Sequence, residues 1–144
     1  MTLAMRLAFC CYLSASMIIL AFALVYLFKG SFMPYHAEAV AMPWHEVPSH
    51  FQVLITALMR AFGGACLTIA VTSLVILYIP FKHGALWAKW LLPSLYLLSS
   101  LAGLYAMKHV INHTQAAPPV AASVLLIVLA LAGLIASLYS KQHQ

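Results

Sequence analysis

Residues 7–28 read LAFCCYLSASMIILAFALVYLF, a run of 22 residues without a charged side chain. About 20 consecutive apolar residues let an α-helix cross the ~30 Å hydrocarbon core of a bilayer. Since hydrocarbon cannot hydrogen-bond a peptide group, a crossing segment must satisfy its backbone within its own structure. The run therefore predicts a membrane-spanning helix.

Three further apolar segments of similar length follow along the chain, and they predict helices at about 50–79, 87–108 and 119–139. Within the second segment the apolar core begins at Ala61, although the helix can start near Ser49. Proline and glycine stand between the segments, where a helix is expected to end. The sequence thus predicts an all-α integral membrane four-helix bundle, a single domain over residues 1–144, with a loop at about 29–49.

The composition excludes an ordinary soluble domain. The chain is 65% hydrophobic and 6% charged, whereas soluble domains are about 25% charged. The seven basic residues outnumber the two glutamates, and most stand singly beside apolar runs, as membrane-flanking residues do. We therefore expect the lipid bilayer as a partner and no nucleic acid. The three cysteines, Cys10, Cys11 and Cys66, fall inside apolar runs and predict buried side chains rather than disulfides.

Orientation in the membrane follows from the basic residues of the short connections. One side carries four of them: Arg6, Lys82, Lys89 and Lys141. The other side carries Lys29, Lys108 and Arg60. This bias predicts both termini in the cytoplasm and the 29–49 loop exported. The first apolar run is longer than a signal peptide usually has, so we expect it to stay as an uncleaved helix.

The stretch MPYHAEAVAMPWHEVPSH, residues 33–50, holds three histidines and both glutamates of the chain. Five histidines map to the exported side: His36, His45, His50, His109 and His113. Pairs four residues apart, such as His109 and His113, share one face of a helix, and imidazole with carboxylate suits zinc or copper. The alternative is structural, because histidine tolerates a membrane interface and no compact ligand motif is present. No histidine lies deep in an expected crossing, which disfavours a bis-histidine haem.

Arg60 lies about 16 Å beyond Ser49 if the second helix rises ~1.5 Å per residue. A charge inside hydrocarbon is costly, so the guanidinium must find a partner or reach the headgroups. We expect an ion pair with Glu46 or with Glu38, the only carboxylate side chains, and keep extension of the side chain to the headgroups as the alternative.

Small residues four apart predict where helices touch, because they let backbones approach closely in lipid. The second expected helix carries Ala57, Ala61 and Ala65, with Gly63 and Gly64 beside them. Similar spacings occur in the third and fourth helices: Ser99 with Gly103, Ala102 with Ala106, Ala132 with Ala136, and Gly133 with Ser137.

Two runs, FKGSFMPYHAEAV at 28–40 and LMRAFGGACL at 58–67, resemble the first half of small four-helix bacterial inner-membrane proteins. The hydropathy layout is also similar to that of the DoxX-like group. The resemblance implies a four-helix inner-membrane protein and carries no catalytic residues with it.

No nucleophile, base and orienting group form a recognisable set, so we expect no enzyme. The sequence favours a structural or accessory protein, working with other membrane subunits or with copies of itself. Two alternatives stay open: a metal- or proton-responsive binding protein that uses the histidine-bearing loop, and a small-solute transporter. A transporter would need a polar cavity, for which the candidates are Arg60, Gln52, Thr56, Thr68, Thr72, Ser73, Ser99 and Ser100.

Overall fold

The computed structural model describes residues 2–139, which form five α-helices and no strand. The helices are α1 (Leu3–Phe28), α2 (Pro34–Val40), α3 (Ser49–Ile76), α4 (Leu86–His113) and α5 (Val120–Tyr139). A 3₁₀ turn, Trp44–Glu46, precedes α3, and a π-helical turn, Leu77–Phe81, continues it. Within residues 2–139, α1, α3 with its π-helical turn, α4 and α5 are long and apolar enough to cross a membrane. This confirms the expected all-helical chain with four long apolar helices.

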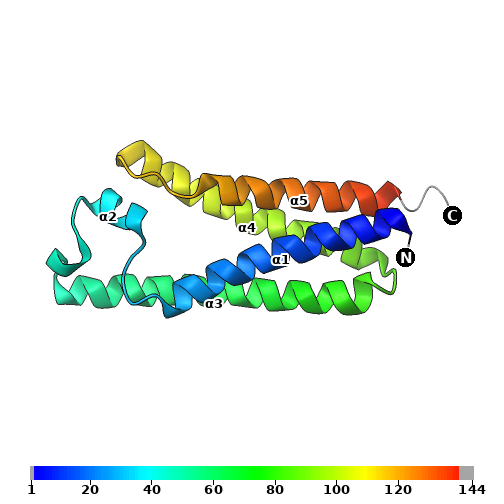
Figure 1. Ribbon diagram of the computed structural model, residues 1–144, viewed down its shortest axis with the longest axis horizontal. Helices are drawn as coiled ribbons and strands as arrows, with labels where there is room; N and C mark the ends of the chain where they lie inside the picture. The colour runs from blue at the N-terminus through cyan, green and yellow to red at the C-terminus, as the bar shows by residue number, and fades with distance from the viewer. Residues whose placement is uncertain (1, 140–144) are drawn as a thin grey trace.

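The four long helices lie side by side in an elongated bundle (Figure 1). α1 packs along both α3 and α5, and α4 packs along α5, whereas α3 and α4 contact each other little. α1 begins and α5 ends at one end of the bundle, which we call the terminal end. α2 and the α4–α5 connection lie at the opposite end, which we call the cap end (Figure 1). Three helix pairs are therefore closely packed, α3 with α1, α1 with α5 and α5 with α4, while α3 and α4 leave space between them.

The core is densest in the half of the bundle toward the terminal end. Tyr12, Tyr96 and Phe81 are fully buried there, and the Tyr12 ring centroid lies 5.4 Å from Phe81 and 5.9 Å from Tyr96. Ser16 Oγ and Tyr96 OH share a hydrogen bond of 2.8 Å between α1 and α4. Gly133 makes room for Tyr12, because a Cβ at that position would lie 2.5 Å from Tyr12 Cε1.

The small residues of α3 do not all serve the contact that their spacing predicts. Gly63 is buried, and a Cβ there would lie 2.9 Å from the backbone nitrogen of Leu27 in α1. Ala57, Ala61 and Ala65 are exposed instead. The face of α3 that meets α1 is the one with Gly63 rather than the alanine stripe. In α5 the predicted pair Gly133 and Ser137 is buried, and so is Ala136, but its predicted partner Ala132 is exposed.

Residues 29–48, which we call the cap, are structured and contain α2, a helix that the sequence did not predict. Pro34 occupies the first turn of α2, and the Met33 N–H donates to His36 Nδ1 over 3.3 Å. The helix ends at Val40, and the residue after it, Ala41, has a φ of 52° in the left-handed region. Phe32 and Val47 are buried against Tyr26 of α1 and Met59 of α3. The cap is thus held on the ends of α1 and α3.

Candidate functional site

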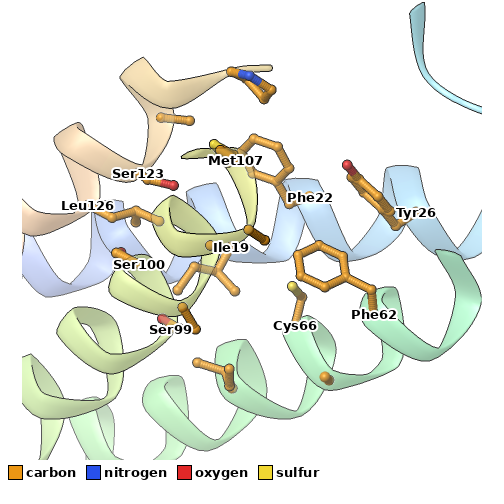
Figure 2. A pocket seen from close by; sticks show the side chains of 17 residues that line it. Ile19, Phe22, Tyr26, Phe62, Cys66, Ser99, Ser100, Met107, Ser123 and Leu126 are labelled. Atoms are coloured by element: carbon orange, nitrogen blue, oxygen red, sulfur yellow. The ribbon is translucent and has the colours of Figure 1, made fainter. Parts of the chain in front are cut away.

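A cavity of about 430 Å³ opens between α3 and α4, in the half of the bundle toward the cap end. We call it the lateral cavity. All four long helices line it (Figure 2). Its α3 wall is Phe62, Ala65, Cys66 and Ile69, and its α4 wall includes Ser99, Ser100, Gly103 and Ala106. Because Ala65 and Ala106 are also exposed, the cavity opens sideways, toward the long side of the bundle.

Several of the side chains that face each other across the α3–α4 gap are small. Ala65 and Cys66 stand on α3, and Ala102, Gly103 and Ala106 stand on α4. A Cβ at Gly103 would meet only Ser123 Oγ, at 3.5 Å. α3 packs along α1 and α4 packs along α5, whereas α3 and α4 contact each other little, which leaves space between them.

The two sides of the lateral cavity differ in chemistry (Figure 2). Three hydroxyls, those of Ser99, Ser100 and Ser123, lie on the side of α4 and α5. Aromatic rings of Phe62 and Tyr26 lie on the opposite side, their centroids 4.8 Å apart and edge to face. None of the described residues that line the cavity is charged. The site therefore favours a neutral molecule that is largely apolar.

The serine hydroxyls on this side are not equivalent. Ser99 Oγ donates to the carbonyl of Tyr96 over 3.1 Å, as serines in helices commonly do. The side chain of Ser100 is only 2% exposed, and its Oγ has no hydrogen-bond partner among residues 2–139. Buried hydroxyls nearly always have a partner, and the Ser73 and Tyr12 hydroxyls share this exception; the Ser100 oxygen has almost no accessible surface, so it lies behind the cavity wall.

The cap is connected to the lateral cavity through Tyr26, whose hydroxyl forms a hydrogen bond with that of Tyr35 in α2. His36 follows Tyr35 and is surrounded by rings, with its centroid 4.2 Å from Tyr35, 6.3 Å from Tyr26 and 6.4 Å from Phe32. Burial lowers the pKa of His36 below its ordinary value of 6.5, because the charged imidazolium loses hydration. Burial likewise raises the pKa of Tyr35.

The five histidines proposed as metal ligands are spread over separate elements of the cap end. His36 is enclosed by the aromatic rings of the cap, while His45 and His50 are exposed on the 3₁₀ turn and the first turn of α3. His109 and His113 are adjacent on α4, with ring centroids 4.4 Å apart. No group of three or more histidine, cysteine, aspartate or glutamate side chains comes within metal-binding reach anywhere in residues 2–139.

Glu38 and Glu46 interact with residues other than Arg60. Glu46 Oε1 lies 3.7 Å from Nε2 of the neighbouring His45, on the surface. Glu38 Oε2 accepts a hydrogen bond from the Ala117 N–H over 3.2 Å. Among the described residues Arg60 forms no ion pair with either glutamate, and its side chain is exposed. Geometry explains the difference, because Glu46 precedes α3 whereas Arg60 lies about 16 Å along it.

Lys89 is a buried cation that the sequence reading placed at the membrane surface. It is 6% exposed, and its Nζ donates to the carbonyl of Ser137 over 3.4 Å. That carbonyl belongs to the last turn of α5, where carbonyls lack partners within the helix and the helix dipole is negative. The sequence spacing could have indicated this burial, because it places Lys89 on the same face of α4 as Leu92, Tyr96 and Ser100, and that face is buried.

Four of the eight polar residues considered for a transport pathway, Gln52, Thr56, Thr68 and Ser99, donate to nearby backbone. Gln52 Nε2 donates to the carbonyls of Trp44 and Val47, each over 2.9 Å. Thr56 and Thr68 donate to carbonyls one turn earlier in α3. Of the eight candidates, Ser99 and Ser100 line the lateral cavity.

Comparison with known proteins finds no family model, no curated protein and no solved structure that matches this chain.

Proposed function

We propose that this protein is a non-catalytic accessory protein of a membrane, and that it binds a neutral apolar molecule from the bilayer. One observation carries the proposal: the lateral cavity of about 430 Å³ between α3 and α4, with no charge among its described lining residues. Its volume falls in the range of about 300–1,000 Å³ that small-molecule sites occupy. Its sideways opening gives a ligand dissolved in the bilayer a direct route.

The chemistry of the lining supports binding rather than turnover. Its polar groups are the serine hydroxyls, the Tyr26 hydroxyl and the Cys66 thiol. None of them lies beside a histidine or carboxylate of the lining that could act as a base, and catalysis by a nucleophile requires such a partner. A neutral apolar molecule gains from burial against the small and aromatic side chains, and the cavity can hold it without chemistry.

The orientation that fits this function is the one that the basic residues favour. We place the protein in a bacterial inner membrane with both termini in the cytoplasm, and the cap and the lateral cavity toward the exported side. Lys82, in the connection at the terminal end, and Arg6 support this orientation. The ligand would then enter from the outer leaflet.

Filling the cavity tests the proposal. Ala106→Phe introduces a ring into the opening, whereas Ala61→Phe places the same ring on an exposed face of α3 outside the cavity. Each buried methylene contributes about 0.8 kcal/mol, so excluding two of them weakens binding by about tenfold. Mass spectrometry of organic extracts should find about tenfold less co-purifying apolar lipid in Ala106→Phe and the wild-type amount in Ala61→Phe. Equal amounts in all three proteins would contradict the proposal.

A second candidate, a proton-responsive protein, is favoured by the position of His36. Its neutral ring is enclosed by the aromatic side chains of the cap, and Tyr35 and Tyr26 connect that cluster to the lateral cavity. Protonation would place a charge among these rings and remove the acceptor of the Met33 N–H. A pH titration of the cap, followed by Trp44 fluorescence, tests this candidate.

A further inference from the structure

We infer that His109 and His113, at the end of α4, chelate a divalent metal ion of the zinc and copper class. The pair lies outside the lateral cavity, so the inference goes beyond the proposed function and does not depend on it. Three observations carry it: the mutual position of the two imidazoles, the proton that a backbone carbonyl places on one of them, and their depth relative to the membrane.

The two imidazoles are positioned to share one ion. They stand four residues apart in the last turns of α4, so they share one face of the helix. Their ring centroids are 4.4 Å apart and the ring planes are tilted by 37°. Two nitrogens on a tetrahedral zinc ion lie about 3.3 Å apart, because each Zn–N bond is about 2.0–2.1 Å long. Rotation of the side chains alone brings rings at this separation to that geometry, and two histidines four apart bind zinc in this way in helical zinc motifs.

A backbone contact fixes the tautomer of His113. Its Nδ1 lies 2.8 Å from the carbonyl oxygen of His109. Since a carbonyl oxygen only accepts hydrogen bonds, Nδ1 carries the proton, and Nε2 of the neutral ring keeps its lone pair for a metal. Histidines that bind metals usually donate their other ring N–H in this way. Both side chains are exposed, and the His109 ring makes no hydrogen bond within residues 2–139. The pair therefore offers one oriented nitrogen donor and a second that is free to turn toward the same ion.

The depth of the pair gives aqueous ions access to it. Lys108 lies 19 residues after Lys89, and the residues between them are uncharged. At ~1.5 Å per residue this is about 28 Å of helix, which matches the ~30 Å hydrocarbon core. The hydrocarbon then ends near Lys108, and His109 begins the part of α4 beyond it. The charge of Lys108 does not face the pair, because adjacent residues of a helix point in different directions.

The donor atoms select the class of ion. Imidazole nitrogens suit zinc, copper and nickel, whereas calcium and magnesium prefer oxygen ligands. Two protein ligands leave coordination positions for water, so the site binds metal more weakly than a closed structural site with four protein ligands. A bound ion would join residues one turn apart at the end of α4. The Thr114 amide, which donates to the Val110 carbonyl over 2.9 Å, lies in the same turn. The ion should therefore stabilise this end of α4.

The test compares the full-length wild type with His109→Ala, His113→Ala and His83→Ala, each purified in mild detergent with an affinity tag that contains no histidine. After metal has been removed with a chelator, Zn²⁺ is titrated into each protein in a calorimeter. Hydrogen exchange of the Thr114 amide is measured with and without Zn²⁺. His83→Ala is the matched control, because His83 Nδ1 also contacts the carbonyl four residues earlier, that of Ile79 at 2.6 Å, but no second imidazole stands there. Thermal unfolding without zinc shows whether each variant folds.

We expect the wild type and His83→Ala to bind Zn²⁺ with the same affinity, and zinc to slow exchange of the Thr114 amide in both. Loss of either ligand should weaken this binding at least as much as loss of a group that only orients a metal ligand, which costs about 10–100-fold. It should also abolish the effect of zinc at Thr114. The inference is overturned if the wild type binds no Zn²⁺. It is equally overturned if His109→Ala and His113→Ala bind Zn²⁺ as the wild type does, since other histidines would then hold the ion. Neither result bears on the apolar ligand of the lateral cavity.

Discussion

At Gly133 a missing side chain decides how closely two helices pack. A Cβ there would lie 2.5 Å from Tyr12 Cε1, inside any ordinary contact, and the Tyr12 ring is fully buried between α4, α5 and the π-helical turn. We expect Gly133→Ala to destabilise the protein by about 1–3 kcal/mol, the usual cost of overpacking a core. Thermal unfolding in detergent measures the change.

The control for this substitution is Gly64→Ala. No atom lies within 4 Å of a Cβ built at Gly64, so the only expected effect is the gain in helix propensity, up to about 1 kcal/mol. If both alanine variants unfolded at the same temperature, the contact between Gly133 and Tyr12 would not limit the approach of α1 to α5.

The burial of His36 predicts that the cap is sensitive to pH. Burial lowers the pKa of His36 from 6.5, so the folded cap binds a proton less readily than the unfolded chain. The resulting stability is fully present above pH 6.5 and is lost as the pH falls through the lower pKa of the folded state. We expect Trp44 fluorescence to change between pH 7.5 and 5, since the Trp44 ring packs 4.8 Å from Phe32 in the same cluster.

Two variants assign this transition to one residue. His36→Asn keeps an oxygen that can accept from the Met33 N–H but does not titrate, so the change in Trp44 fluorescence should disappear. His45→Asn removes the exposed imidazole next to Trp44 and should leave the transition in place. A transition that persists in His36→Asn would show that another group titrates.

A hydrogen bond joins α2 to the α4–α5 connection. Glu38 Oε2 in α2 accepts it from the Ala117 N–H over 3.2 Å. We expect Glu38→Ala to speed hydrogen exchange at the Ala117 amide by about fivefold, because the lost bond to a carboxylate is exposed and worth about 1 kcal/mol. Glu38→Gln keeps an acceptor and should exchange more slowly than Glu38→Ala. Exchange followed by mass spectrometry distinguishes the two, and identical rates in both variants and the wild type would exclude the tether.

The elements also show what a sequence can and cannot predict. The four long helices could be predicted because a helix that crosses a membrane needs about 20 apolar residues, and this pattern does not depend on how the helices pack. The seven-residue α2 was not, since its formation depends on local capping at Met33 and His36 and on packing of Phe32. Nor was the contact face of α3, where spacing favoured Ala57, Ala61 and Ala65 and packing used Gly63.

The candidate site was less predictable than the fold for the same reason. Ser99 and Ser100 could be named as lining residues from their position in an apolar helix. The volume beside them depends on the distance between α3 and α4, which follows from how α1 and α5 hold each of them. The residue pattern of one helix does not determine the distance between that helix and another. The burial of Lys89 was not predicted because its side chain is basic, although its spacing with Leu92 and Tyr96 places it on the buried face of α4.

The cap lies at one end of the bundle, and the start of α1 and the end of α5 lie at the other (Figure 1). In the proposed orientation the cap faces the exported side and the α3–α4 connection faces the cytoplasm. His50 and His83 are exposed at these two ends, and they lie on either side of the same long helix, α3 with its π-helical turn. A cysteine at each position therefore reports the side of the membrane.

We expect His50→Cys to react with a membrane-impermeant maleimide in cells whose outer membrane has been permeabilised and whose inner membrane is intact. His83→Cys should react only after the inner membrane is broken. The wild-type protein serves as the blank, because Cys10, Cys11 and Cys66 all lie within α1 and α3, in the segments expected to cross the hydrocarbon. The reverse pattern would invert the orientation and move the entry of the lateral cavity to the inner leaflet. Labelling of both positions without breaking the inner membrane would mean that α3 does not cross it, and the lateral cavity would then face water instead of the lipid from which its ligand must come.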